Sequence, residues 1–251
     1  MQEFSVLNIF LLVLGGGVAG FVNTLAGGGS FLTIPLLIFM GLPPTVANAT
    51  NRVGVFLQSL TATRQLHSHG VFPVRFSLIV AIPAALGSVL GTYAAMLISE
   101  AAFKKYLAVF MILMTLLTFF RPTAMPARPV GNYTFGRWAM LWLLFFGIGL
   151  YGGFIQAGVG FLIIAAMSLS GYDLVAGTAT KSFVILLLTC VSLAIFWVGG
   201  KVQVVPGLAL GAGSMLGAFV GSKVTVSKGN GFIQKFVVAM VILSAILLLV
   251  K

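Results

Sequence analysis

Charged residues, acids above all, and cysteine are scarce in this chain of 251 residues. Only 7% of the residues are charged, whereas soluble domains carry about 25%. Hydrophobic residues make up 60% of the chain, and the mean hydropathy is +1.16. This composition excludes a soluble enzyme, a disordered segment and a soluble DNA-binding domain. It predicts an all-α polytopic membrane protein, with the lipid bilayer as its main partner.

The shortage of acids is sharper still, since three Asp and Glu stand against fourteen Lys and Arg. We expect no nucleic-acid partner, because no basic patch with interleaved aromatic residues lies outside the apolar segments. The basic excess is typical of the cytoplasmic loops of a multi-pass protein, here in the plasma (inner) membrane. The one cysteine, Cys190, excludes an intramolecular disulfide, and its apolar surroundings predict that it is buried. We expect no metal and no cofactor.

Apolar runs follow one another along the chain, and most are long enough to span the bilayer, which takes about 20 residues. The runs are 5–25, 31–41, 45–66, 75–98, 103–120, 138–157, 161–170, 174–198, 202–222 and 232–250. Two of them, 31–41 and 161–170, reach only about halfway, at ~1.5 Å of rise per residue.

Each short run follows a glycine cluster, formed by Gly27, Gly28 and Gly29 in one case and by Gly158 and Gly160 in the other. A helix break at membrane depth is tolerated where it is packed in protein or lines a cavity. Tight helix packing is the alternative use of such glycines. Because the pattern recurs in the same context, we favour two functional breaks.

The two halves of the chain match each other. Identical residues 130 positions apart are Gly41 and Gly171, Ala49 and Ala179, Thr50 and Thr180, Gly70 and Gly200, Leu86 and Leu216, Gly87 and Gly217, Gly91 and Gly221, and Lys105 and Lys235. We therefore predict two homologous membrane repeats, 1–120 and 138–251, joined by a proline- and arginine-rich linker at 121–137. Each repeat is expected to contain about three full spans and a glycine-broken pair of one long and one short helix.

The relative direction of the repeats depends on how the broken pair crosses the membrane. A re-entrant pair, or a pair whose members both cross, gives an odd number of crossings and inverted repeats. One broken crossing gives an even number and parallel repeats. The odd counts place eight loop cations on one side against four, and the even count gives seven against five. The charge bias therefore favours inverted repeats with both termini outside the cytoplasm.

Two cations lie inside apolar segments, Arg52 and Lys181. Helical geometry places them roughly 12–15 Å inward, near the bilayer midplane. A charge at that depth indicates function by default, the alternatives being snorkelling or pairing with an acid, for which only Asp173 is close in sequence. We predict that both cations face a polar cavity between the repeats.

Neutral groups accompany the two cations. Side-chain donors are predicted at Asn48, Thr50, Asn51, Thr178, Thr180, Ser182, Asn23 and Gln156, and backbone N–H donors at Gly28, Gly29, Gly158 and Gly160. If the helices break at the Thr and Asn positions, a half-helix N-terminus would favour an anion there. A cation site would instead need acids or a ring of carbonyls. The pattern therefore predicts an anion site.

Two long stretches give the chain a recognisable resemblance. They are AGGGSFLTIPLLIFMGLPPTVANATNR in the first half and AGVGFLIIAAMSLSGYDLVAGTATKS in the second. The chain resembles the TauE/SafE sulfite exporter family of anion permeases over nearly its whole length. The resemblance implies a duplicated membrane unit and export of sulfite or another small sulfur-containing anion, such as a sulfonate or thiosulfate. The second copy has Gly-Val-Gly where the first has Gly-Gly-Gly-Ser, so we expect two unequal half-sites.

The sequence therefore predicts a secondary transporter that exports a small inorganic or organic sulfur anion by alternating access at the midplane site. An importer of a small anion and an anion channel stay open as alternatives. An intramembrane enzyme is disfavoured, since the chain has no HExxH, no GxSxG and no paired carboxylates. Glycine-rich faces such as residues 87–91 leave internal packing and a homodimer equally open.

Overall fold

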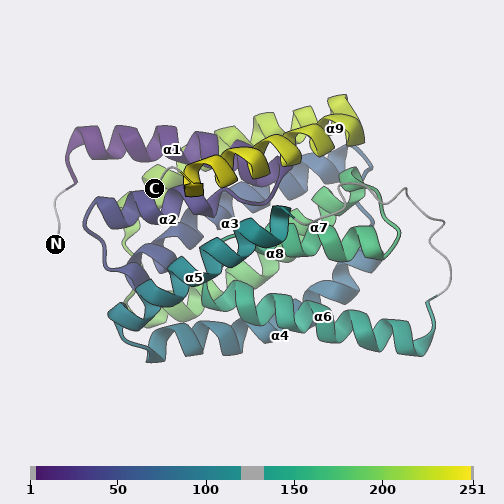
Figure 1. Cartoon of the computed structure of the whole chain (residues 1–251), viewed down its shortest axis with the longest axis horizontal. Helices are drawn as coiled ribbons and strands as arrows, with labels where there is room; N and C mark the ends of the chain where they lie inside the picture. The colour runs from purple at the N-terminus through teal and green to yellow at the C-terminus, as the bar shows by residue number, and fades with distance from the viewer. Residues whose placement is uncertain (1–3, 120–132, 250–251) are drawn as a thin grey trace.

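A computed structural model describes residues 4–119 and 133–249, and within them every regular element is an α-helix. The helices lie alongside one another in a bundle (Figure 1). They are α1 (Val6–Leu25), α2 (Ser30–Phe39), α3 (Pro44–Ser68), α4 (Val74–Leu97), α5 (Glu100–Phe119), α6 (Phe135–Phe154), α7 (Val159–Leu169), α8 (Leu174–Val198) and α9 (Val204–Leu249). Helix α9 carries a kink at Gly229, which divides it into two helical segments.

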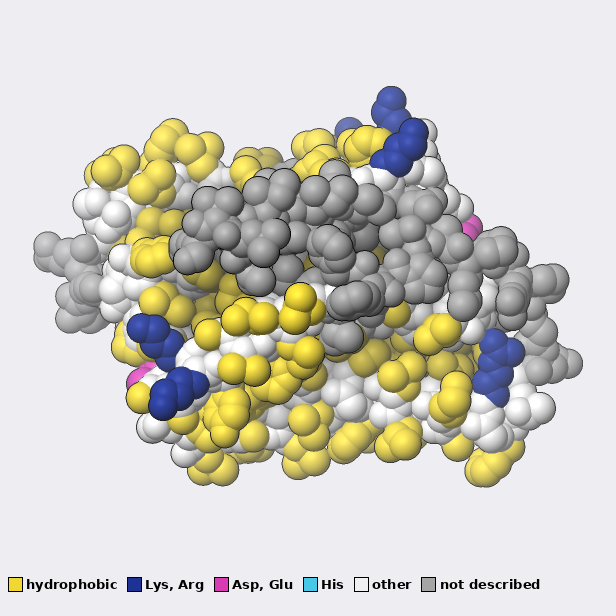
Figure 2. Space-filling model, in the orientation of Figure 1, with side chains coloured by type: hydrophobic (Ala, Val, Ile, Leu, Met, Phe, Trp, Pro, Cys, Tyr) yellow, Lys and Arg dark blue, Asp and Glu magenta, His cyan; other side chains and the backbone are white. Residues whose placement is uncertain are grey.

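The helical segments agree with a multi-pass membrane protein. Within the described residues, five are long and apolar enough to cross a membrane: Val6–Leu25, Val74–Leu97, Phe135–Phe154, Leu174–Val198 and Val204–Ile233. Figure 2 shows hydrophobic side chains spread over much of the described surface of one face, with Lys and Arg in view near its left and right ends and at its upper right. The prediction that Cys190 is buried is wrong, because its side chain is exposed on α8. In a bilayer an apolar position can face lipid as readily as the protein core.

The two predicted glycine breaks are present. Helix α1 ends at Leu25, and α2, of 10 residues, begins at residue 30. Helix α6 ends at Phe154, and α7, of 11 residues, begins at residue 159. Gly27 and Gly158 both have the positive φ that glycine adopts without strain, +95° and +79° respectively. The predicted pairs of one long and one short helix are therefore confirmed.

The long helix that precedes each break packs against the other half of the chain. Helix α1 runs beside α9, and α6 runs beside α4 (Figure 1). Glycines make the close approach possible: Gly16 and Gly20 of α1 face backbone of α9, and Gly87 and Gly91 of α4 face backbone of α6. Small residues allow backbones to approach in membranes, where the hydrophobic effect does not drive helices together. The first half and the second half therefore interlock.

The predicted linker at 121–137 lies largely outside the described residues, which resume at Tyr133. Its last three residues are helical, because α6 already begins at Phe135. Helix α6 thus begins three residues before the predicted start of the second repeat at 138, and the division into repeats stays a prediction. Thr134 immediately before the helix has extended backbone, and the aromatic and glycine residues that follow it continue into the apolar run without a turn signal.

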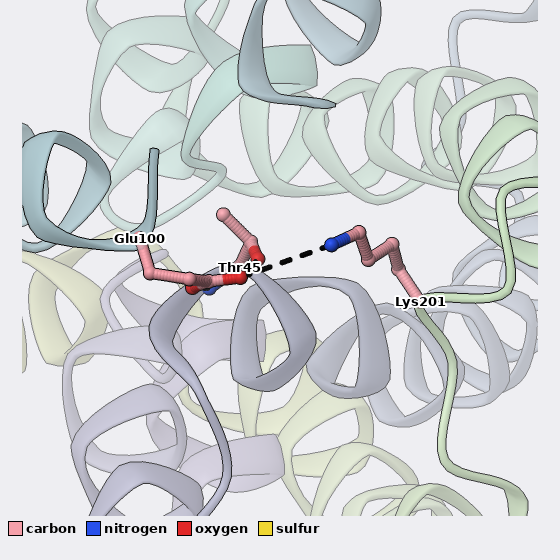
Figure 3. Close-up of polar contacts among 3 residues, drawn as sticks. All are labelled: Thr45, Glu100 and Lys201. Atoms are coloured by element: carbon pink, nitrogen blue, oxygen red, sulfur yellow. Dashed lines mark hydrogen bonds and ion pairs between the residues drawn. The ribbon is translucent and has the colours of Figure 1, made fainter. Parts of the chain in front are cut away.

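A carboxylate caps the start of α3 through hydrogen bonds at one end of the bundle (Figure 3). Glu100, at the start of α5, accepts hydrogen bonds from the backbone N–H of Thr45, at 2.8 Å, and from its hydroxyl. Lys201, which follows α8, lies 3.8 Å from the same carboxylate. In the second half the backbone N–H of Val175 donates to Asn230 at 3.0 Å, and both residues lie 130 positions after Thr45 and Glu100.

Replacing Glu100 with alanine is expected to lower the free energy of unfolding by about 2 kcal/mol, because two bonds to a charged acceptor are lost. Asn230→Ala loses one neutral bond and should lower it by about 1 kcal/mol. Lys201→Ala removes only a half-exposed ion pair and should change it by less than about 1 kcal/mol. Thermal unfolding of the purified variants in detergent measures all three. A larger loss in Lys201→Ala than in Glu100→Ala would contradict this ranking.

Candidate anion site at two helix breaks

Arg52 lies on α3 and is fully buried, with none of its surface exposed. Its guanidinium donates to the carbonyl oxygens of Gly153, at 2.6 Å, and Gly152, at 3.1 Å, in the last turn of α6. It also donates to the hydroxyl of Ser192 on α8, at 2.6 Å, and stands 5.0 Å from the centre of the Phe196 ring. Arg52 therefore joins α3 to the end of the long helix before the second break.

Lys181 makes the corresponding contacts at the first break. Its ammonium group, on α8, donates to the carbonyl oxygens of Asn23, at 2.8 Å, and Thr24, at 2.5 Å, in the last turn of α1. The residue is 1% exposed. The carbonyls at a helix C-terminus carry partial negative charge and attract cations. Each buried cation thus caps the broken long helix of the other half of the chain.

No carboxylate neutralises these cations within the described residues. Glu100 caps the start of α3, and Asp173 caps α8 by accepting the N–H of Ala176 at 2.7 Å. The third acid of the chain, Glu3, lies outside the described residues. A buried cation is costly unless it is paired, and carbonyl dipoles compensate only part of a full charge. The interior around the breaks therefore favours an anion.

The two breaks meet each other inside the bundle. A methyl group at Gly27 would lie 2.7 Å from Cα of Gly160, so the two backbones are in direct contact. The rings of Phe31 and Phe161, from the first turns of α2 and α7, stack with centroids 6.3 Å apart and 26° between their planes. Sequence reasoning missed this pair among 22 phenylalanines, although the two positions differ by the repeat offset of 130.

Several predicted site residues bind neighbouring helices. Asn51 accepts from the hydroxyl of Thr33, at 2.6 Å, and donates to the hydroxyl of Ser30, at 3.2 Å, which ties α3 to the short helix α2. Two further contacts link distant parts of the chain, Thr50 with the N–H of Gln203 and Thr180 with the hydroxyl of Ser77. Ser182 instead donates to the carbonyl of Thr178 within α8.

The remaining predicted residues lie at the breaks themselves. Asn23 accepts the N–H of Gly29 at 3.4 Å across the first break. A methyl group at Gly28 would meet the Phe161 ring, and one at Gly158 would meet the Phe31 ring. These glycines therefore hold the backbone close to the stacked pair.

At the second break, Asn48 donates to the carbonyl of Phe154 at 3.0 Å, and Gln156 donates to the hydroxyl of Thr189 at 2.7 Å. Both side chains are buried, with 0% and 2% of their surface exposed. Thr189 and Ser192 lie one turn apart on α8, so Gln156 and Arg52 contact the same face of that helix. No motif or spacing in the sequence indicates the roles of Thr189, Ser192 and Phe196.

The expected break at the Thr and Asn positions is absent, because α3 runs unbroken through residues 48–52 and α8 through residues 178–182. The half-helix starts are instead those of α2 and α7, after the glycines. The stretch Ala49–Arg52 contains no glycine or proline. Its polar side chains form hydrogen bonds with residues outside α3. Such residues need not interrupt the backbone when lateral partners exist.

Apolar spanning helices, two glycine breaks in contact and two buried cations together define a polytopic membrane protein with an interior polar site. The chain belongs to the sulfite exporter TauE/SafE family, which it matches over residues 12–248.

Its relatives are named as membrane transporters, in agreement with a transporting and non-enzymatic protein. It is 31% identical to a "Probable membrane transporter protein" of Haemophilus influenzae, over 90% of this chain and 88% of the relative. A protein of the same description from Sinorhizobium is 28% identical, over 99% and 95%. The protein YfcA of Escherichia coli is 28% identical, over 88% and 82%. No solved structure matches the chain.

Proposed function

We propose that this protein is a secondary transporter that exports sulfite or a related small sulfur-containing anion through a site between the two breaks. The observation that carries the proposal is the burial of Arg52 and Lys181 without a carboxylate partner among the described residues. A small tetrahedral or pyramidal oxyanion offers several acceptor atoms to such donors. Membership of the sulfite exporter family supports sulfur oxyanions as the substrate class.

We also propose that residues 1–120 and 138–251 are inverted repeats. In support, the start of α3 and the end of α8 lie at the same end of the bundle, where Glu100 contacts Thr45 and approaches Lys201. Helices α3 and α8 occupy equivalent positions in the two halves, since their bounds differ by 130. An antiparallel relation between equivalent helices is what inverted repeats require.

In the proposed mechanism the substrate anion competes with the carbonyls at the two helix ends for Arg52 and Lys181. In the described conformation the carbonyls of α6 and α1 hold the two cations. An entering anion competes for the same N–H donors and loosens the contact between each cation and the opposite half. One half then moves against the other about the contact between Gly27 and Gly160, and the site opens to the far side. An inside-negative potential favours anion export by about 2.3 kcal/mol per charge per 100 mV.

Efflux from proteoliposomes tests the proposal. Vesicles loaded with radiolabelled sulfite should release it with saturable kinetics, and an imposed lumen-negative potential should accelerate the release. Cys190→Ser, an exposed position on α8, serves as a functional control. Efflux that equals that of protein-free vesicles would contradict the assignment. Discrete single-channel currents carried by the same anion would show that the protein is a channel and not a transporter.

A further inference from the structure

The two breaks differ in how completely their polar groups are bonded. At the first break Lys181 donates to two carbonyls, and the side-chain oxygen of Asn23 accepts from Gly29. Both polar atoms of the Asn51 side chain are also bonded, to Thr33 and Ser30. These groups at the first break therefore satisfy one another and hold the short helix α2 in place, although the hydroxyl of Thr178, three residues before Lys181 on α8, is one buried polar atom without a partner among the described residues.

The second break leaves three buried polar atoms without a partner within the described part of the chain. They are Oδ1 of Asn48, Nε of Arg52 and Oε1 of Gln156, which are three of the five such atoms in the described residues. All three side chains gather round the end of α6: Asn48 bonds Phe154, Arg52 bonds the two residues before it, and Gln156 follows two residues later.

Three buried polar atoms without partners destabilise the fold unless a ligand completes their hydrogen bonds. A buried polar atom without a partner has lost its hydrogen bonds to water and gained none in return, which destabilises the fold. Gln156 also carries the positive φ of +67°, the one non-glycine residue among the described residues that does so, and a strained backbone of this kind clusters at functional sites. The orientation of the Asn48 amide is fixed, because only its nitrogen can donate to the carbonyl of Phe154.

We infer that the second break is the ligand-binding half-site and that its ligand is an anion with a hydrogen-bond donor of its own. Nε of Arg52 donates to an oxygen of the ligand, while the side-chain oxygens of Asn48 and Gln156 accept from its O–H or N–H. A sulfonate with a hydroxyl or ammonium group, or a singly protonated oxyanion, has this chemistry. The inference rests on the proposed function, since it names the ligand of the same interior site.

The pair isethionate and ethanesulfonate tests the inference, since the two anions have equal charge and differ by one hydroxyl. Their dissociation constants, with sulfite as reference, are measured by calorimetry on the purified full-length protein in detergent. Isethionate is expected to bind at least about tenfold more tightly than ethanesulfonate. In Gln156→Met, which lacks the acceptor, the ratio should fall to about twofold or less. Gln58 is also a buried glutamine but lies on α3, so Gln58→Met should keep the wild-type ratio.

The outcomes separate the inference from the proposed function. If sulfite binds and isethionate binds no better than ethanesulfonate, the inference is overturned and the proposed function stands; an ordered water at the three atoms would produce this result. An unchanged ratio in Gln156→Met overturns the inference in the same way. If none of the three anions binds to the wild-type protein, the interior anion site fails, and with it both proposals.

Discussion

Arg52→Gln is expected to reduce sulfite efflux by about 100-fold or more, because truncating a buried, hydrogen-bonded charge costs about 2–5 kcal/mol of binding. The protein should nevertheless remain folded. Glutamine can still donate to one of the carbonyls of Gly152 and Gly153, so we expect the free energy of unfolding to fall by only about 1–3 kcal/mol. Initial efflux rates and thermal unfolding, measured on the same preparation, separate the two effects.

Arg64→Gln provides the matched control on the same helix, since Arg64 is exposed near the end of α3. It should leave both efflux and stability unchanged. Arg52→Lys keeps the charge but loses the forked geometry, so it should retain more activity than Arg52→Gln. Wild-type efflux in Arg52→Gln would show that the guanidinium is a structural cap for α6 and takes no part in transport.

Gly27→Ala should be strongly destabilising, with a loss of about 2–5 kcal/mol in the free energy of unfolding. Two causes act together. The φ of +95° strains any residue with a Cβ, and the added methyl would lie 2.7 Å from Cα of Gly160. Backbone atoms cannot swing aside as a flexible side chain can, so the contact between the two breaks must open.

Gly147→Ala is the control for this prediction. Gly147 lies within α6, is exposed, and has no atom within 4 Å of a Cβ added to it. Alanine should leave stability unchanged or raise it by up to about 1 kcal/mol, because glycine is a poor helix former. Thermal unfolding in detergent, followed by tryptophan fluorescence, measures the stability of both variants. Equal stability of the two variants would mean that the breaks do not pack as described.

The sequence predicted those features that local chemistry dictates. Apolar runs located the helices to within a few residues, and the glycine clusters located both breaks. The depth of Arg52 and Lys181 in apolar segments predicted that they face a polar cavity; both side chains are buried, and the cavity stays a prediction. Each of these inferences needed only residue type and spacing, which the membrane constrains strongly because unbonded backbone is not tolerated in lipid.

The partners of these residues could not be read from the sequence, because they come from distant parts of the chain. Arg52 binds carbonyls about 100 positions later, and Lys181 binds carbonyls about 160 positions earlier. Backbone carbonyls also carry no residue signature, so no motif could identify them as ligands. The same limit explains why the sequence left open a helix break at Thr50 and Asn51. Their hydrogen bonds to distant residues, which the sequence does not reveal, are compatible with a continuous α3.

The pairing of α1 with α9 has a consequence for biosynthesis. Leu25 ends α1 and Val204 begins α9, so about 180 residues separate the two partners along the chain. At a synthesis rate of ~5–20 residues per second, α1 waits roughly 10–40 s in the membrane before its partner emerges from the ribosome. During that time the face with Gly16 and Gly20 meets only lipid or other proteins of the insertion machinery. Helix α1 is thus made long before the helix against which it packs.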